Sequence, residues 1–244
     1  MLSVHKWLPA ERVGVPRPGH VDVWIVALDG VQGGEPEAAD LAPDEAERAH
    51  RLRFEADRRR FVGSRVALRR ILAGCLGVAS REIAFRASPF GKPRLDPERH
   101  GSALRFNVSH SGDLALVAVS GEVEVGVDIE LRRPRPDLEA LVARYFSPGE
   151  RVAIAALPAA HRLEAFFDYW TLKEAYLKAC GDGLNRRLDA FDVVLDHDLP
   201  PRLVDVRDRP GDQYRWTLAQ LRPAAGYAAA IAAERSDPAA SWRR

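Results

Sequence analysis

The sequence contains little cysteine, no long apolar run and almost no net charge. Its two cysteines, Cys75 and Cys180, lie far apart among apolar or small residues, which gives neither a disulfide framework nor a metal-binding spacing. No stretch approaches the roughly 20 consecutive apolar residues of a membrane-spanning helix. The N-terminal residues also lack the apolar segment of a signal peptide. We therefore expect a cytoplasmic protein with reduced cysteines and no membrane partner.

The composition is otherwise that of an ordinary globular protein. Hydrophobic residues make up 46% and charged residues 29% of the 244 positions, which is enough apolar material for a sizeable core. The formal net charge of +1 implies no general attraction to nucleic acid. Arginines nevertheless cluster between Arg48 and Arg70. Such a cluster is typical either of a solvated helix face or of an anion-binding face, because the planar guanidinium matches phosphate oxygens.

Hydrophobic spacing predicts two long helices and several short strands. In the first half of the chain, a strand at 21–28 precedes a helix with Pro43 in its first turn and a long helix at 56–76. In the second half, a long helix at 161–180 ends at a glycine cap. The other predicted strands lie at 83–86, 104–108, 114–119, 123–129, 191–195, 214–218 and 227–232.

The order of these elements is similar in the two halves of the chain. The strands at 114–119 and 123–129 are separated by a short turn at Ser120-Gly121, which predicts a hairpin. We place the boundary between the halves in this turn, with an N-terminal α+β half at 1–120 and a C-terminal α+β half at 121–244. No repeat is visible residue by residue, so the prediction of two similar α+β halves depends on element order.

Acidic residues alternate with apolar ones near the middle of the chain. Asp128 and Glu130 would leave a strand on the same face because side chains alternate along a strand. On the second long helix, Glu174 and Lys178 are four residues apart and would lie side by side. Carboxylates from a strand and a facing helix form the all-oxygen site that Mg²⁺ prefers when it also holds phosphates. This pattern predicts phosphoryl-transfer chemistry.

Several of these residues also have a purely structural interpretation. Asp128 and Glu130 fit an exposed hairpin edge, and His110 fits a core or capping position. Glu150 closes a capping box at a helix start, and Lys173 could pair with Glu150 or with another carboxylate. Serine hydrolase chemistry is not expected, because no acidic residue is placed to orient His110.

Four motifs occur in a fixed order between about Arg60 and about Phe191. They are Phe106–Ser111 (FNVSHS), Gly126–Glu130 (GVDIE), Phe146–Glu150 (FSPGE) and Trp170–Lys178 (WTLKEAYLK). Together they resemble the Sfp-type 4′-phosphopantetheinyl transferases. The resemblance implies a fold of two similar α+β halves with the active site between them. It also implies transfer of the phosphopantetheine arm of coenzyme A to a serine of an acyl or peptidyl carrier protein, with release of 3′,5′-ADP.

The resemblance assigns roles to residues in the two acidic motifs. Asp128, Glu130 and Glu174 match the Mg²⁺ ligands of the family, and Lys178 matches the lysine on the pyrophosphate. The catalytic residues implied are Glu174, Lys178 and Asp128. A serine hydroxyl needs a base at neutral pH, and we expect Glu174 to remove its proton directly or through a metal-bound water.

The resemblance also implies coenzyme A contacts outside the acidic motifs. Ser109 and His110 match contacts to the 3′-phosphate, and Arg60 matches an arginine on the same side. Lys92 matches the lysine of a Gly-Lys-Pro turn near the nucleotide. The chain departs from the family pattern before the first long helix. Some members have two lysines there, whereas this chain has Glu47 and His50, with Arg48 and Arg51 nearby as substitutes.

The family resemblance further implies a monomer, because both halves lie in one chain, and a role in secondary-metabolite biosynthesis. The carrier remains open among those of fatty acid, polyketide, nonribosomal peptide and siderophore synthesis, and so does the choice of Mg²⁺ over Mn²⁺. Two other classes of function fit parts of the pattern. One is a non-catalytic module that binds an acidic partner through the arginine helix, and the other is a Mg²⁺-dependent hydrolase of nucleotide pyrophosphates.

Overall fold

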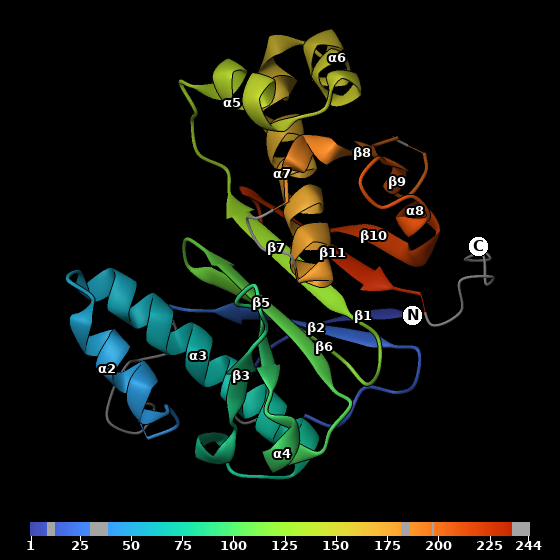
Figure 1. Ribbon diagram of the computed structural model, residues 1–244. Helices are drawn as coiled ribbons and strands as arrows, with labels where there is room; N and C mark the ends of the chain where they lie inside the picture. Colours follow the sequence, from blue (N-terminus) through green and yellow to red (C-terminus); the bar gives the residue numbers. More distant parts are fainter. Residues whose placement is uncertain (9–12, 30–38, 182–185, 197, 236–244) are drawn as a thin grey trace. The chain divides into compact units, whose positions relative to one another are not determined.

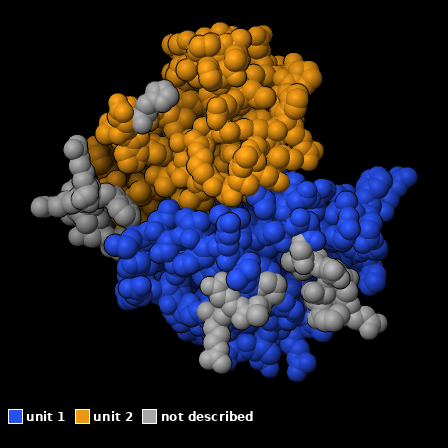
Figure 2. Space-filling view, turned by 180° about the vertical axis from the view of Figure 1, so that it is seen from behind, with its two compact units in different colours: residues 1–88, 93–122 blue, residues 89–92, 123–244 orange. Residues whose placement is uncertain are grey.

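The computed structural model describes residues 1–8, 13–29, 39–181, 186–196 and 198–235. The chain divides into two compact units (Figure 2). Unit 1 comprises residues 1–88 and 93–122, and unit 2 comprises residues 89–92 and 123–244. The short segment 89–92 therefore belongs to unit 2 although unit 1 precedes and follows it in sequence.

Unit 1 contains a four-stranded sheet with the order β1-β2-β6-β5. Its strands are β1 (Leu2–Lys6), β2 (Val21–Ala27), β5 (Arg105–Ser111) and β6 (Leu114–Ser120). Strand β1 is parallel to β2, and the other neighbours are antiparallel. A second, two-stranded sheet pairs β3 (Phe85–Ala87) with β4 (Pro93–Leu95).

The long helix α3 of unit 1 (Glu55–Leu76) covers the four-stranded sheet (Figure 1). Its apolar side chains pack in one buried cluster with Trp24 of β2 and with β5 and β6. Gly77 ends the helix in the left-handed conformation (φ 69°), which glycine adopts without steric cost. The described part of this unit also contains the shorter helices α2 (Pro43–Arg51) and α4 (Pro97–His100) and a 3₁₀ turn at Ser80–Glu82.

Unit 2 contains a three-stranded antiparallel sheet with the order β10-β11-β7. Its strands are β7 (Val125–Leu131), β10 (Trp216–Leu221) and β11 (Tyr227–Glu234). The long helix α7 (Ala159–Cys180) lies across β7 and β11 (Figure 1). The unit also contains α5 (Leu138–Tyr145), α6 (Pro148–Ala156), α8 (Asp212–Arg215), the pair β8 (Phe191–Val194) and β9 (Arg202–Val206), and a 3₁₀ turn at Leu188–Ala190.

The structure confirms the α+β class and both long helices, but the predicted hairpin at Ser120-Gly121 is wrong. Strand β6 already has β2 and β5 as its two neighbours, so no free edge remains for the strand that follows. Strand β7 pairs instead with β11, about a hundred residues later. The strand predicted at 214–218 also needs correction, because 212–215 form α8 and the strand begins at Trp216.

Among the described residues, no helix is both long enough and apolar enough to cross a membrane. The two longest helices, α3 and α7, carry ionisable side chains along their length.

Candidate active site

Strand β7 and helix α7 come into backbone contact at Gly126. A Cβ atom at this position would lie 2.2 Å from the carbonyl oxygen of Ala175 and 2.3 Å from the amide nitrogen of Ala179. Backbone atoms cannot move aside as a flexible side chain can, so glycine is required here. The residue paired with Gly126 on β11 is Ala232, which is also small. We call this contact between β7 and α7 the seam.

The seam brings Asp128 of β7 next to Lys178 of α7. Asp128 lies two residues beyond Gly126 and so shares the strand face that α7 covers. Its side chain is buried, and Lys178 Nζ donates to its Oδ1 over 2.6 Å. The lysine is more accessible, because 30% of its side chain is exposed. The ion pair therefore has one buried carboxylate and one cation that solvent or a ligand can reach.

Glu174 lies one helical turn before Lys178 and has an altered proton affinity. Its pKa is raised to about 7, first because burial disfavours the charged carboxylate and second because Asp128 repels it. Lys178 opposes this shift, and Glu130 adds to it. Glu130 lies two residues beyond Asp128 on β7 and therefore shares its strand face. The seam thus gathers three acidic groups and one basic group.

The donor chemistry of the seam suits a hard divalent cation. Within the described part of the chain, no three His, Cys, Asp or Glu side chains form a ready-made metal cluster. Mg²⁺ does not need one, because it binds one or two protein carboxylates and keeps positions for water and substrate phosphates. A cation near Asp128, Glu130 and Glu174 would relieve the repulsion that raises the pKa of Glu174. The residues present therefore fit the ion in donor type and in charge.

Lys92 has contacts that the sequence did not lead us to expect. Its ammonium donates to Glu124 Oε2 at 2.9 Å, to the Val125 carbonyl at 3.1 Å and to the Ala179 carbonyl at 3.0 Å. The residue is largely buried. The Lys92 ammonium thus contacts protein groups at the end of the seam, and its predicted contact with the nucleotide stays a prediction.

The remaining predicted coenzyme A contacts lie in unit 1. Ser109 and His110 are part of strand β5, where Ser109 is buried and His110 is exposed. The interpretation of His110 as a core residue is therefore wrong. Arg60 of α3 donates through Nε and Nη2 to Asp113 Oδ1, at 3.1 and 3.0 Å, in the turn that follows β5. Unit 1 thus places Arg60 at the end of β5 that carries Ser109 and His110.

The arginine-rich helix α3 is not uniformly a solvated or phosphate-binding face. Arg69 is only 1% exposed, and its guanidinium bonds Glu45 of α2 and the carbonyls of Ser80 and Ile83. Arg70 pairs with Asp40. For Arg69, the predictions of a solvated face and of an anion-binding face are both wrong. Its buried guanidinium instead links α3 to α2 and to the turn after α3.

Helix α7 is fixed on its other flank by a buried ion pair. Lys173 Nζ donates to Glu150 Oε1 at 2.5 Å and to the Phe191 carbonyl at 2.7 Å, and both charged side chains are almost fully buried. Burial lowers the pKa of Lys173, and Glu150 opposes that shift. The Ser147–Glu150 capping box is present at the start of α6. The structural interpretation of Lys173 and Glu150 is therefore confirmed.

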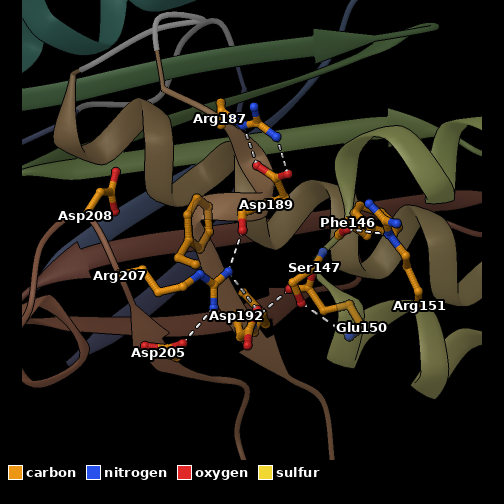
Figure 3. A network of polar contacts seen from close by, with 12 residues as sticks. Phe146, Ser147, Glu150, Arg151, Arg187, Asp189, Asp192, Asp205, Arg207 and Asp208 are labelled. Carbon is orange, nitrogen blue, oxygen red and sulfur yellow. Dashed lines mark hydrogen bonds and ion pairs between the residues drawn. The ribbon is translucent and has the colours of Figure 1, made fainter.

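A polar network extends from this pair over β8 and β9 (Figure 3). The guanidinium of Arg207 bonds Asp205 Oδ2 at 2.6 Å and Asp192 Oδ1 at 3.3 Å. It also donates to the carbonyl of Asp189. No local pattern in the sequence indicates this network beyond the capping box, because it joins elements that are far apart in the chain, as in the hydrogen bond from the Val193 amide to Glu150, 43 residues away.

The chain matches known proteins in both of its units. The family model "4′-phosphopantetheinyl transferase superfamily" matches residues 124–232, and "4′-phosphopantetheinyl transferase, N-terminal" matches residues 36–122. The 4′-phosphopantetheinyl transferase HetI of Nostoc sp. is 39% identical over 93% of this chain and 93% of its own length. A putative 4′-phosphopantetheinyl transferase of Synechocystis sp. is 36% identical over 84% of this chain and 80% of its own length.

A crystal structure of a holo-(acyl-carrier-protein) synthase from Bacillus anthracis, in complex with CoA (3′,5′-ADP), is 24% identical over 47% of this chain and 98% of that chain, with a TM-score of 0.39. The family matches cover both units, and the match at 124–232 includes the four seam residues Asp128, Glu130, Glu174 and Lys178. The chain belongs to the 4′-phosphopantetheinyl transferases.

Proposed function

We propose that this enzyme transfers the 4′-phosphopantetheine arm of coenzyme A to a serine of an acyl or peptidyl carrier protein, in a Mg²⁺-dependent reaction that releases 3′,5′-ADP. The observation that carries the proposal is the seam, where Asp128, Glu130, Glu174 and Lys178 share one region of unit 2. A diphosphate would be repelled by these carboxylates alone, so acids and phosphate can share the region only with cations between them.

Asp128, Glu130 and Glu174 are the residues that would hold Mg²⁺. When bound, the ion supplies a Lewis acid that neutralises charge on the diphosphate. Lys178 adds a protein cation to this region: its ammonium is partly exposed, so it can bind a phosphate oxygen while Asp128 holds it in place.

Glu174 is the proposed general base. The serine oxygen of the carrier bonds to the phosphorus that bears pantetheine, the phosphoanhydride bond breaks, and 3′,5′-ADP leaves with the bonding electrons. The serine proton passes to the Glu174 carboxylate. A base is most effective when its pKa lies near the working pH. In the metal-free protein, burial and the neighbouring Asp128 shift the pKa of Glu174 upward, in that direction.

Residues of unit 1 are proposed to bind the other end of coenzyme A. Arg60, Ser109 and His110 occupy one end of β5 and the helix face beside it, and they offer a guanidinium, a hydroxyl and an imidazole. These groups suit the 3′-phosphate, because charge-assisted hydrogen bonds favour dianionic oxygens. When coenzyme A binds, the Arg60 guanidinium would release Asp113 and contact the 3′-phosphate instead.

A transfer assay tests this function directly. Purified protein, coenzyme A, Mg²⁺ and an apo carrier protein should yield a carrier whose mass has increased by one phosphopantetheine group, with 3′,5′-ADP released in equal amount. Omitting Mg²⁺ in the presence of EDTA should stop the reaction. Glu174→Gln should lower kcat by at least about 100-fold, the usual contribution of a general base. Near-normal turnover in this variant would remove Glu174 from the role of base.

A pyrophosphatase acting on nucleotides is the second candidate, because the same acidic seam would suit it. The transfer assay separates the two: nucleotide release without any carrier protein would favour the hydrolase. Release that requires the carrier serine, and that disappears when this serine is replaced by alanine, would favour transfer.

A further inference from the structure

The Lys92 ammonium touches both sides of the seam at the end marked by Gly126. The carbonyl of Val125 belongs to β7 and directly precedes Gly126, whereas the carbonyl of Ala179 belongs to the last turn of α7 and directly follows Lys178. Glu124, the third acceptor, precedes β7. One charged group thus joins the beginning of the strand to the end of the helix.

The position of this ammonium is electrostatically favourable. The last carbonyls of an α-helix lack intrahelical partners and carry partial negative charge, so a cation at the C-terminus stabilises the helix. The lysine stem packs on Gly181, the left-handed residue that ends α7, where an added Cβ would lie 3.3 Å from Lys92 Cδ. Lys92 therefore fastens the end of α7 through its ammonium and through its stem.

We propose that Lys92 is a positioning residue that fixes α7 on β7 and so sets the separation of Glu174 and Lys178 from Asp128. The inference deepens the proposed function, on which it rests, and it differs from a direct role of the Lys92 side chain in binding the nucleotide. A direct ligand contact would affect binding of coenzyme A. A positioning role would affect the chemical step, since displacement of reacting groups by about 1 Å can cost up to about 100-fold in rate.

Three variants separate these roles. Lys92→Met keeps the apolar stem and removes the ammonium, whereas Lys92→Arg retains a cation that can donate to the same carbonyls. Lys6→Met, which removes an exposed lysine of β1, is the matched control. We expect Lys92→Met to lower kcat about tenfold while the KM for coenzyme A stays within about twofold. Lys92→Arg should restore most of kcat, and Lys6→Met should match the wild type.

Hydrogen–deuterium exchange on the same proteins gives a readout that does not depend on activity. In Lys92→Met, exchange should accelerate in peptides from the last two turns of α7 and from the start of β7, and remain unchanged in peptides from α3. A raised KM for coenzyme A with kcat intact would overturn the proposal in favour of ligand contact. Unchanged exchange at the seam would overturn it as well, and so would a loss of thermal stability with kcat unchanged. If the wild type transfers no phosphopantetheine, the proposed function fails, while the exchange experiment still decides whether Lys92 fixes the seam.

Discussion

The helix pairs α2–α3 and α6–α7 are built on the same plan, although they belong to different units. Each pair consists of a nine-residue helix with proline at its start and a 22-residue helix that ends at a left-handed glycine. The central strands follow the same order as well, because β2-β6-β5 corresponds to β7-β11-β10 with antiparallel pairing throughout. Each unit thus contains one of the two similar α+β halves that the element order predicts.

The resemblance extends to a buried ion pair at the same place in both helix pairs. Arg69 and Lys173 each lie 14 positions after the first residue of their long helix, and each is buried. Each pairs with a glutamate at the third position of the preceding short helix, Glu45 or Glu150. Both glutamates also accept a hydrogen bond from the backbone amide that starts the short helix. In each helix pair, the buried glutamate thus links the start of the short helix to the long helix.

The two long helices differ in the residues that follow the buried cation. The positions that hold Glu174 and Lys178 in α7 hold Arg70 and Gly74 in α3. The sheets differ too: β2 presents Trp24 and Val26 to α3, whereas β7 presents Gly126 and Asp128 to α7. The scaffold is therefore repeated, while β7 has less side-chain bulk than β2 facing its long helix, and α7 has a carboxylate and an ammonium where α3 has Arg70 and Gly74.

The first prediction, which has the largest expected effect, tests the buried ion pair found in both helix pairs. Glu45→Gln should lower the free energy of unfolding by about 4 kcal/mol and Glu150→Gln by about 3 kcal/mol, because each leaves a buried cation without its counter-charge. Glu150→Gln should cost less, since Lys173 can release its proton whereas arginine cannot. Urea unfolding at pH 7 and pH 9 measures both. If only one of the two variants is destabilised, the pairs are not equivalent in function.

The second prediction tests the close contact that distinguishes the two units. Gly126→Ala should destabilise the protein by about 2–3 kcal/mol and reduce transfer, because the new methyl group meets backbone atoms of α7. Gly74→Ala is the matched change on α3, where the added Cβ would lie 2.8 Å from the nearest backbone atom, the carbonyl oxygen of Val13. The higher helix propensity of alanine, about 1 kcal/mol, offsets that contact. Equal effects in the two variants would contradict the special role of the seam.

The third prediction concerns pH. The pKa of Glu174 is about 7 in the folded chain and 4.5 ordinarily, so the ionised carboxylate destabilises the folded state as the pH rises from about 4.5 through 7. In EDTA, Glu174→Gln should therefore be about 2 kcal/mol more stable than the wild type at pH 8, and nearly equal to it at pH 4. Thermal unfolding measures this difference. Glu139→Gln, an exposed change on α5, serves as control; a pH-independent difference for Glu174→Gln would refute the assigned cause.

The smallest effect concerns the cysteine near the end of each long helix. Burial, with a contribution from Asp22, raises the pKa of the Cys75 thiol to about 12, so its reactive thiolate is scarce at pH 8. Cys180 is more accessible. A thiol reagent at pH 8 should therefore modify Cys180 before Cys75 in the folded protein, and mass spectrometry of the digested protein identifies the site. Modification of Cys75 at a comparable rate would show that the end of α3 opens readily.

The helices could be predicted from the sequence because their signals are local. The spacing of apolar residues, the proline starts and the glycine ends located α3 and α7 to within two residues. The hairpin at Ser120-Gly121 failed because strand pairing is decided by distant partners, here β2, β5 and β11. A local turn signal carries no information about which edges are already occupied.

The candidate site was predictable to the same limited extent. Alternation in β7 and the four-residue spacing in α7 indicated which side chains share a face. The ion pair between Lys178 Nζ and Asp128 Oδ1, 2.6 Å apart, was not predicted. The role of Gly126 was missed, although a glycine inside a strand is a known sign of close backbone approach. The contacts of Lys92 and the pairing of Arg69 with Glu45 could not be predicted, because they join segments 24 or more residues apart.

The chain has only four lysines but many arginines. Three of the lysines lie on α7 or contact it. Lys92, Lys173 and Lys178 each hold an ion pair there, whereas Lys6 is exposed at the end of strand β1. Amine-reactive dyes and biosensor surfaces should consequently attach through Lys6 in preference to the three ion-paired lysines. The scarcity of lysine thus offers a way to immobilise or label the native enzyme while leaving α7 unmodified.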